Sequence, residues 1–140
     1  MDRCFAYGSL MCPDIMSRVS GLAVPGEPAT LAGHARHPVA HEDYPGLVAE
    51  PCGRAEGVLY RGLDAAALAR LDAFEGEMYE RRALRVNLVG GEVVTAWCYV
   101  FRERYRDRLL PGDWRFDHFL AVGRARFLAR YVGFNALPSE

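Results

Sequence analysis

The segment from Asp64 to Gly76 constrains the fold of this chain most strongly. It predicts a short helix, because the Asp64 side chain can cap a helix N-terminus and Gly76 suits the left-handed conformation that often ends one. Its apolar positions recur at helical spacing and form one stripe, made of Ala67, Leu68, Leu71 and Phe74. We therefore expect this helix to pack against a core.

Glu75 lies inside the apolar stripe, four residues after Leu71 and seven after Leu68. Burying an unpaired carboxylate costs several kcal/mol, so the group needs partners or a raised pKa. The negative end of the helix dipole raises the pKa further, toward the neutral range that suits a general base. The alternative is a structural carboxylate that backbone N–H groups or an arginine satisfy.

Length and composition favour one cytoplasmic domain over residues 1–140. The net charge of −1 gives no overall attraction for nucleic acid or an anionic membrane, and no apolar run approaches the ~20 residues that span a bilayer. No signal peptide is visible, and the four cysteines form no Cys-x-x-Cys pair. We expect reduced thiols, no nucleic-acid partner and no membrane partner, and the oligomeric state stays open.

Most of the remaining chain is typical of strands. Gly90-Gly91 lies between two apolar runs and predicts a hairpin over about residues 85–101. Further strands are predicted over 4–7, 29–39, 47–50 and 55–60, turns over 43–46 and 51–53, and helices over 10–19 and 116–132. Six or seven strands that do not alternate with helices predict an α+β fold, a mixed sheet able to close into a small barrel with helices outside.

Two patterns suggest other ligands, and both have a simpler interpretation. His34, His37 and His41 have a spacing that could bind metal on a helix, but the segment looks extended and Pro38 would break a helix. We expect no metal there. Arginines alternate with acids and Tyr105 over residues 102–108, which could be a phosphate-binding strip, although mixed charge favours a solvated face.

The Gly8-Ser9 turn follows the first strand and precedes a helix, so it presents free backbone N–H groups that could bind an anion or oxyanion. Ser9 could suggest a serine hydrolase. The Gly-x-Ser-x-Gly elbow is missing, however, and no histidine has an assigned partner. A hydrogen bond within the loop is the favoured role of its side chain.

Several motifs, taken in order, resemble the γ-glutamylcyclotransferase-like superfamily. They are Phe-Ala-Tyr-Gly-Ser-Leu at 5–10, Asp-Tyr-Pro-Gly-Leu at 43–47, Glu-Gly-Val-Leu-Tyr-Arg-Gly-Leu at 56–63 and Leu-Asp-Ala-Phe-Glu-Gly-Glu-Met-Tyr-Glu-Arg at 71–81. The similarity covers about residues 3–101. It is greatest to the branch that includes plant avirulence-induced proteins and γ-glutamylamine cyclotransferases.

This resemblance implies a small mixed β-barrel flanked by helices, and a reaction without metal or cofactor. Family enzymes release 5-oxoproline from a small-molecule γ-glutamyl amine or peptide, as the α-amine attacks the γ-carbonyl. The resemblance implies that Glu75 is the general acid/base. Substrate-binding roles are implied for the backbone of Tyr7, Gly8, Ser9 and Leu10, which would hold the carboxylate or oxyanion, and for the pocket tyrosines Tyr79 and Tyr99.

Two other functions use the same residues. One is a non-catalytic γ-glutamyl-binding or regulatory module, and the other is a lyase that removes a γ-glutamyl group from a biosynthetic intermediate. The leaving amine should lie near the His41–Pro45 turn and the Tyr105–Trp114 region, whose sequences do not identify it.

Overall fold

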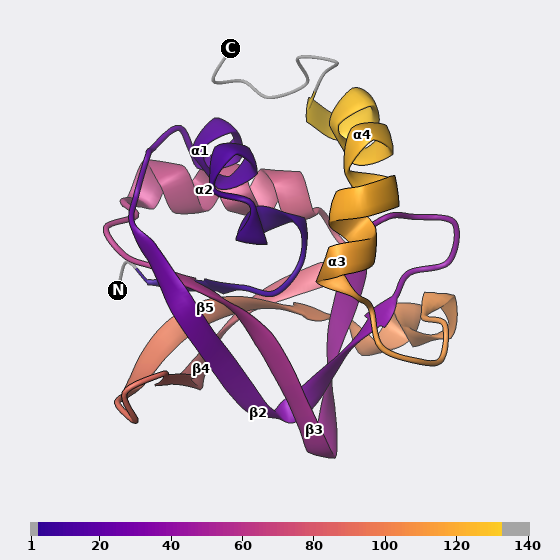
Figure 1. The fold of residues 1–140 in the computed structure, drawn as a ribbon, viewed down its shortest axis with the longest axis horizontal. Coiled ribbons are helices and arrows are strands. Elements are labelled where there is room, and N and C mark those ends of the chain that lie inside the picture. Colours follow the sequence, from indigo (N-terminus) through magenta and orange to yellow (C-terminus); the bar gives the residue numbers. More distant parts are fainter. Residues whose placement is uncertain (1–2, 133–140) are drawn as a thin grey trace.

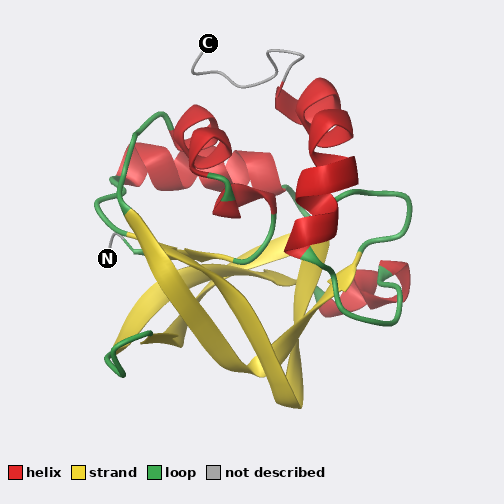
Figure 2. Ribbon diagram, in the orientation of Figure 1, coloured by secondary structure: helices red, strands yellow, loops and turns green. Residues whose placement is uncertain are grey.

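The computed structural model describes residues 3–132, which form a closed barrel with helices against one side (Figures 1 and 2). The strands are β1 (Cys4–Ala6), β2 (Gly26–Pro38), β3 (Pro45–Tyr60), β4 (Tyr79–Leu88) and β5 (Val93–Phe101). The principal helices are α1 (Pro13–Ser20), α2 (Ala65–Glu75), α3 (Phe116–His118) and α4 (Arg124–Phe127). Short 3₁₀ turns lie at Ser9–Met11 and Glu103–Arg108.

The strands follow the order β1-β3-β2-β4-β5 around the barrel. Most neighbours are antiparallel, and the parallel contact of Cys4 with Trp97 joins β1 to β5 and closes the ring. The helices gather on one side of this barrel (Figure 1). The structure confirms the expected α+β barrel flanked by helices.

Two predicted turns differ from the structure: one is absent and the other is displaced. The predicted turn over 51–53 lies inside β3, which is one strand from Pro45 to Tyr60, so the described residues form five strands. Pairing with β2 shifts between Ala32 and His34, and Gly33 takes a φ of 75° at this bulge. The bulge accommodates the Pro-Cys-Gly sequence without ending the strand. The turn predicted over 43–46 lies slightly earlier, because β3 already begins at Pro45.

The apolar residues form two layers. Along β5, Val94, Ala96 and Cys98 point into the barrel, whereas Tyr99 and Phe101 belong to the layer under the helices. This alternation follows from the two-residue repeat of a strand. The outer layer contains the cavity described below.

Helix α2 has the predicted boundaries and caps. The Asp64 carboxylate accepts a hydrogen bond from the Ala67 N–H at 2.8 Å, and Gly76 ends the helix with a φ of 79°. The stripe residues Ala67, Leu68 and Leu71 are buried. Because the stripe packs inward, the last turn of α2 brings Glu75 to the barrel.

The last helix runs from Phe116 to Val132 as α3, a π-helical turn at Phe119–Gly123, α4 and a second such turn at Leu128–Val132. Phe119 and Phe127 are buried, whereas Leu120, next to Phe119 in the chain, is 48% exposed. The π-helical turn between them changes the angular spacing of side chains. No helix within residues 3–132 is long and apolar enough to cross a membrane.

Candidate active site

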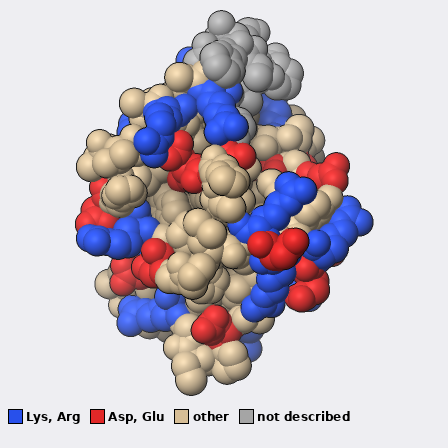
Figure 3. Space-filling view, turned by 90° about the vertical axis from the view of Figure 1, so that its right-hand side faces the viewer, with Lys and Arg blue, Asp and Glu red and all other residues tan. Residues whose placement is uncertain are grey.

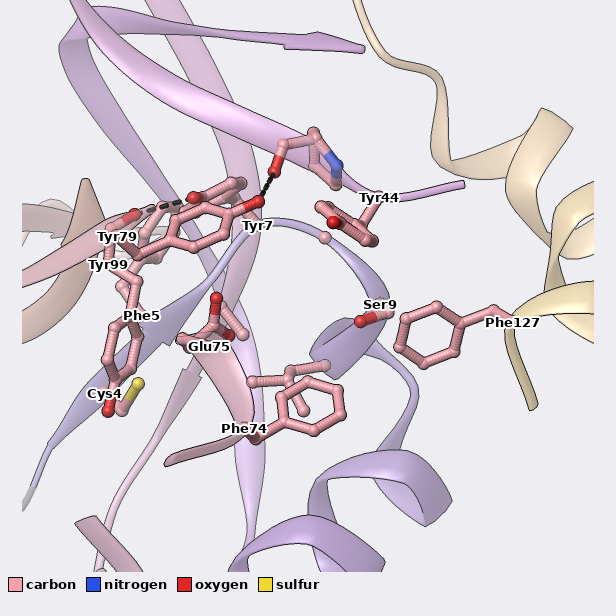
Figure 4. A pocket seen from close by; sticks show the side chains of 14 residues that line it. Cys4, Phe5, Tyr7, Ser9, Tyr44, Phe74, Glu75, Tyr79, Tyr99 and Phe127 are labelled. Carbon is pink, nitrogen blue, oxygen red and sulfur yellow. Dashed lines mark hydrogen bonds between the residues drawn. The ribbon is translucent and has the colours of Figure 1, made fainter. Parts of the chain in front are cut away.

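A cavity of about 160 Å³ lies between the barrel and the helices (Figure 4). β1 and the following loop form one wall, the end of α2 a second, and β4, β5 and the last helix contribute aromatic side chains. The lining residues are Cys4, Phe5, Ala6, Tyr7, Gly8, Ser9, Leu10, Tyr44, Pro45, Phe74, Glu75, Tyr79, Tyr99 and Phe127. All seven residues singled out from the sequence are among them, although their proposed roles stay predictions.

Glu75 is the one charged residue that lines the cavity within the described chain. Its carboxyl lies between the β1 side and the helix side of the cavity (Figure 4). Burial, and secondarily the negative charge of Asp72, raise its pKa from 4.5 to about 8. A carboxyl with such a pKa can accept and return a proton near neutral pH.

Asp72 lies one turn before Glu75 on α2, and its carboxylate, unlike that of Glu75, has hydrogen-bond donors among the described residues. Its carboxylate accepts hydrogen bonds from Arg81 at 2.8 Å and from the Tyr99 hydroxyl at 2.7 Å. Residues 3–132 provide no such donor to the Glu75 carboxyl. Of the two acids, only Glu75 is therefore available to a ligand inside the cavity.

The loop after β1 presents backbone donors to the same cavity. It begins a 3₁₀ turn in which the N–H groups of Met11 and Cys12 donate to the carbonyls of Gly8 and Ser9. The N–H groups of Gly8, Ser9 and Leu10 donate to no acceptor within residues 3–132. Three free N–H groups at such a turn can bind a carboxylate or an oxyanion.

Glycine is required at position 8 by a close approach. A Cβ there would lie 2.7 Å from Cδ of Pro45, the first residue of β3. Real Cβ atoms do not come that near a ring carbon, so a larger residue would displace the loop or β3. Pro45 thus packs directly against the donor loop.

Tyrosine hydroxyls fix the walls of the cavity. Tyr7 donates to the carbonyl of Tyr99 at 2.6 Å, and Tyr79 donates to that of Pro45 at 2.7 Å. Figure 4 draws both rings beside Glu75. Burial raises the pKa of Tyr7 and of Tyr99, so both phenols stay neutral and serve as donors. The Tyr99 hydroxyl donates its hydrogen bond to Asp72, so Tyr99 contributes its ring to the wall of the cavity.

Arg36 supports the donor loop from behind, a role that the sequence analysis missed. This buried guanidinium donates to the carbonyls of Tyr7 at 2.9 Å and Glu56 at 3.0 Å, and stacks 5.2 Å from the ring centre of Trp114. Its charge-assisted bonds hold the loop in place. The available signal was that Arg36 is the one arginine, lysine or acid in the strand predicted over residues 29–39.

Of the two segments expected beside the leaving amine, one lines the cavity, and where the amine binds stays a prediction. Tyr44 and Pro45, from the predicted His41–Pro45 turn, line the cavity, but no residue of the Tyr105–Trp114 region does. Trp114 instead donates its indole N–H to the carbonyl of Asp43 and packs on Phe119. Phe74 and Phe127 complete this side of the cavity.

The other sequence patterns have structural explanations. His34 bonds the carbonyl of Ala32 and His37 that of Gly112, and residues 3–132 contain no cluster able to hold a metal ion. The segment 102–108 is largely a 3₁₀ turn whose Arg106 pairs with Glu103. Figure 3 shows arginine and acidic side chains interleaved on the face it draws, with no patch of one sign. Among residues 3–132, no histidine that could activate Ser9 lines the cavity.

Comparisons with known proteins agree with the motifs. The family model described as "Gamma-glutamyl cyclotransferase, AIG2-like" matches residues 4–116. Protein AIG2 C of Arabidopsis thaliana is 27% identical over 128 residues, which cover 91% of this chain and 77% of that protein. AIG2-like protein A of the same plant is 27% identical over 130 residues, with coverages of 91% and 77%.

Solved structures show the same fold. A solution structure of an Arabidopsis thaliana protein superposes with a TM-score of 0.70 at 26% identity, covering 98% of this chain and 85% of that one. A structure of a gamma-glutamyl cyclotransferase gives a TM-score of 0.67 at 15% identity, with coverages of 97% and 87%, and supports the fold alone. These matches confirm the resemblance and the fold drawn from the sequence.

Proposed function

Since this chain belongs to the gamma-glutamyl cyclotransferase, AIG2-like family, we propose that it is a γ-glutamyl cyclotransferase that releases 5-oxoproline and a free amine from a γ-glutamyl amide. The observation that carries the proposal is the Glu75 carboxyl, which lies in a cavity with no donor from residues 3–132. A half-buried acid that has no donor within residues 3–132 is suited to a cationic ligand, here the α-ammonium of the glutamyl group.

The size of the cavity agrees with this substrate. Its volume of about 160 Å³ resembles the ~150 Å³ of an engineered cavity that binds benzene. One glutamyl group is of that order, whereas a whole peptide is not. The leaving amine must therefore extend toward the open side of the cavity.

The reaction begins when the substrate ammonium lies beside Glu75. The positive charge lowers the pKa of this carboxyl and favours its ionised form. Glu75 then takes one proton from the ammonium, and the free amine attacks the γ-carbonyl carbon to close the five-membered ring. The attack is intramolecular, so the enzyme gains much of its rate by holding the substrate folded.

The backbone N–H groups of Gly8, Ser9 and Leu10 stabilise negative charge in this scheme. They hold either the α-carboxylate of the substrate or the oxyanion of the tetrahedral intermediate. Glu75 returns its proton to the departing nitrogen, and the C–N bond breaks. The attacking nitrogen still carries two hydrogens, so Glu75 takes one of them and passes it to the freed amine. The amine leaves as an ammonium, 5-oxoproline keeps one hydrogen on its ring nitrogen, and Glu75 is ionised again. The protons balance without water, metal or redox cofactor.

The decisive experiment measures 5-oxoproline release from a panel of γ-glutamyl amides by wild type and Glu75→Gln. We expect release by wild type and a loss of at least about a hundredfold in Glu75→Gln, the lower range for a general acid/base. Glu80→Gln is the matched control, because Glu80 is exposed on β4 and is not among the residues that line the cavity. Wild-type rates in Glu75→Gln would remove Glu75 from the mechanism.

The pH dependence is a second readout of the same proposal. The rate constant kcat/KM reports ionisations of the free enzyme, and Glu75 must be ionised to act as the base. We expect kcat/KM to rise through about pH 8, the pKa of this carboxyl. A rise centred near pH 4.5, the usual carboxyl pKa, would contradict the assignment.

Two further parts belong to the proposal. The four cysteines are free thiols, three of them buried, which agrees with action in the cytoplasm, a location that stays a prediction. A binding module with the same cavity would retain γ-glutamyl ligands and release no 5-oxoproline from any amide of the panel. Binding measured by calorimetry alongside turnover separates these two functions.

A further inference from the structure

We propose that the open side of the cavity is a subsite for a leaving amine with an aromatic body and no carboxylate beside the scissile nitrogen. This inference rests on the proposed function, since it identifies the amine half of the same substrate. The aromatic wall that forms this subsite consists of Tyr44, Phe74 and Phe127.

The aromatic wall lies on the helix side of Glu75. Figure 4 draws Phe5 and Cys4 on one side of the Glu75 carboxyl, and Tyr44 and Phe127 on the other. Phe5 and Cys4 are each 1% exposed, so that end is closed. Tyr44 and Phe74 are half-buried, so the group that extends beyond the glutamyl unit meets them.

The rings are arranged as a contact surface. Phe74 and Phe127 lie 6.0 Å apart at 73°, an edge-to-face arrangement. Phe127 is held from behind by Phe119 at 5.7 Å, and Tyr44 packs on Tyr79 at 6.4 Å. Aromatic rings at such separations prefer a further ring over an aliphatic chain. The chemistry of the wall therefore favours an aromatic leaving group.

The charges near the aromatic wall disfavour a carboxylate on the leaving group. No arginine or histidine is among the residues that line the cavity in the described chain. The arginines of the neighbouring helix already have acidic partners: Arg124 pairs with Asp14, Arg126 with Asp43 and Arg130 with Glu42. Glu75 adds a negative charge when the substrate ammonium beside it favours the ionised carboxylate.

Amino acid leaving groups carry a carboxylate next to the scissile nitrogen. The free N–H groups of the loop at 8–10 can satisfy one carboxylate, and the glutamyl unit brings its own. A second carboxylate would be desolvated against aromatic rings without a cation, which is unfavourable. Arylalkyl amines present the same ring without this charge.

Four matched substrates test the proposal with the intact chain: the γ-glutamyl amides of benzylamine, propylamine, cyclohexylmethylamine and phenylalanine. We expect kcat/KM for the benzyl amide to exceed that of the propyl and phenylalanine amides by at least about tenfold each. It should exceed that of the cyclohexyl amide by about twofold or more. Equal rates for benzyl and propyl, or a preferred phenylalanine amide, would overturn the subsite.

Phe74→Leu tests the aromatic wall itself. Removing this half-buried ring should lower the benzyl-to-propyl ratio of kcat/KM by between about twofold and tenfold. Leu120→Ala, on the exposed side of the last helix, is the control and should leave the ratio unchanged. An unchanged ratio in Phe74→Leu would contradict the assignment.

Binding distinguishes failure of the subsite from failure of the proposed function. If no amide releases 5-oxoproline, the proposed reaction is wrong, and calorimetry with the benzyl and propyl amides still tests the aromatic wall. Tighter binding of the benzyl amide by about tenfold would support the subsite without turnover. Equal or absent binding of the two amides would overturn it.

Discussion

Glu75→Gln should make the protein more stable at alkaline pH while it removes activity. The wild-type carboxyl is protonated in the folded state up to about pH 8, because burial and the nearby charge of Asp72 disfavour its ionisation. Glutamine has nearly the same shape and cannot ionise. The two proteins should therefore differ in stability only where the wild-type carboxyl is forced to carry charge.

The magnitude follows from the pKa of Glu75. Because the folded state binds this proton more tightly than the unfolded chain does, the stabilisation is fully present below pH 4.5 and is lost as pH rises through about 8. Each pH unit between the two values corresponds to about 1.4 kcal/mol. The complete loss is thus about 5 kcal/mol, of which about 3 kcal/mol is already lost at neutral pH.

Urea unfolding at a series of pH values from about 4 to 9 measures this difference. We expect the free energy of unfolding of Glu75→Gln to equal that of wild type at the acid end, within about 1 kcal/mol, and to exceed it by several kcal/mol at the alkaline end. The exposed Glu80→Gln should follow wild type throughout. A difference between Glu75→Gln and wild type that does not change with pH would refute the reasoning.

Two other predictions concern residues that support the cavity, and a third concerns metal dependence. Gly8→Ala should lower turnover at least about tenfold, because its Cβ would collide with Pro45. Gly90→Ala is the control and should keep its turnover, because a Cβ at that position has open space. A fully active Gly8→Ala would show that the loop can shift freely. Arg36→Met should lower the free energy of unfolding measured in urea by about 3 kcal/mol and should raise KM, because it leaves the carbonyl of Tyr7 without its donor. Unchanged stability would show that Arg36 does not support the loop. Dialysis against a chelator should leave 5-oxoproline release unchanged, and recovery by one divalent ion after a loss would require a metal in the mechanism.

Local sequence signals predicted those parts of the fold that local physics determines. The caps Asp64 and Gly76 define α2, and Gly90-Gly91 sets the hairpin between β4 and β5. The turn expected around Gly53 was wrong, because a β-bulge at Gly33 in the partner strand allows the Pro-Cys-Gly sequence at 51–53 to lie inside a strand. Whether a Pro-Gly cluster ends a strand depends on its partner strand, which composition does not reveal.

The candidate site was predictable where one element carries the signal. Glu75 stood out as an acid in an apolar stripe, and the loop at 7–10 as a glycine turn after a strand. Arg36 and Phe127 were missed, because their importance depends on contacts with residues far away in the chain, Tyr7 and Phe74. Such contacts become visible only when the barrel and the last helix are in place.

Because Glu75 has no hydrogen-bond donor within residues 3–132, its ionisation links stability and activity with opposite signs. Asp72 lies on the same helix and is satisfied by Arg81 and Tyr99, so the fold could supply donors to an acid in this region. A donor aimed at Glu75 would favour the charged carboxylate, lower its pKa and stabilise the protein, but it would also compete with the substrate ammonium. A purely structural carboxylate would behave differently, because its loss would lower stability and activity together. If Glu75→Gln is more stable than wild type and inactive, the result is therefore evidence that Glu75 is a base whose place near the substrate ammonium costs the protein stability.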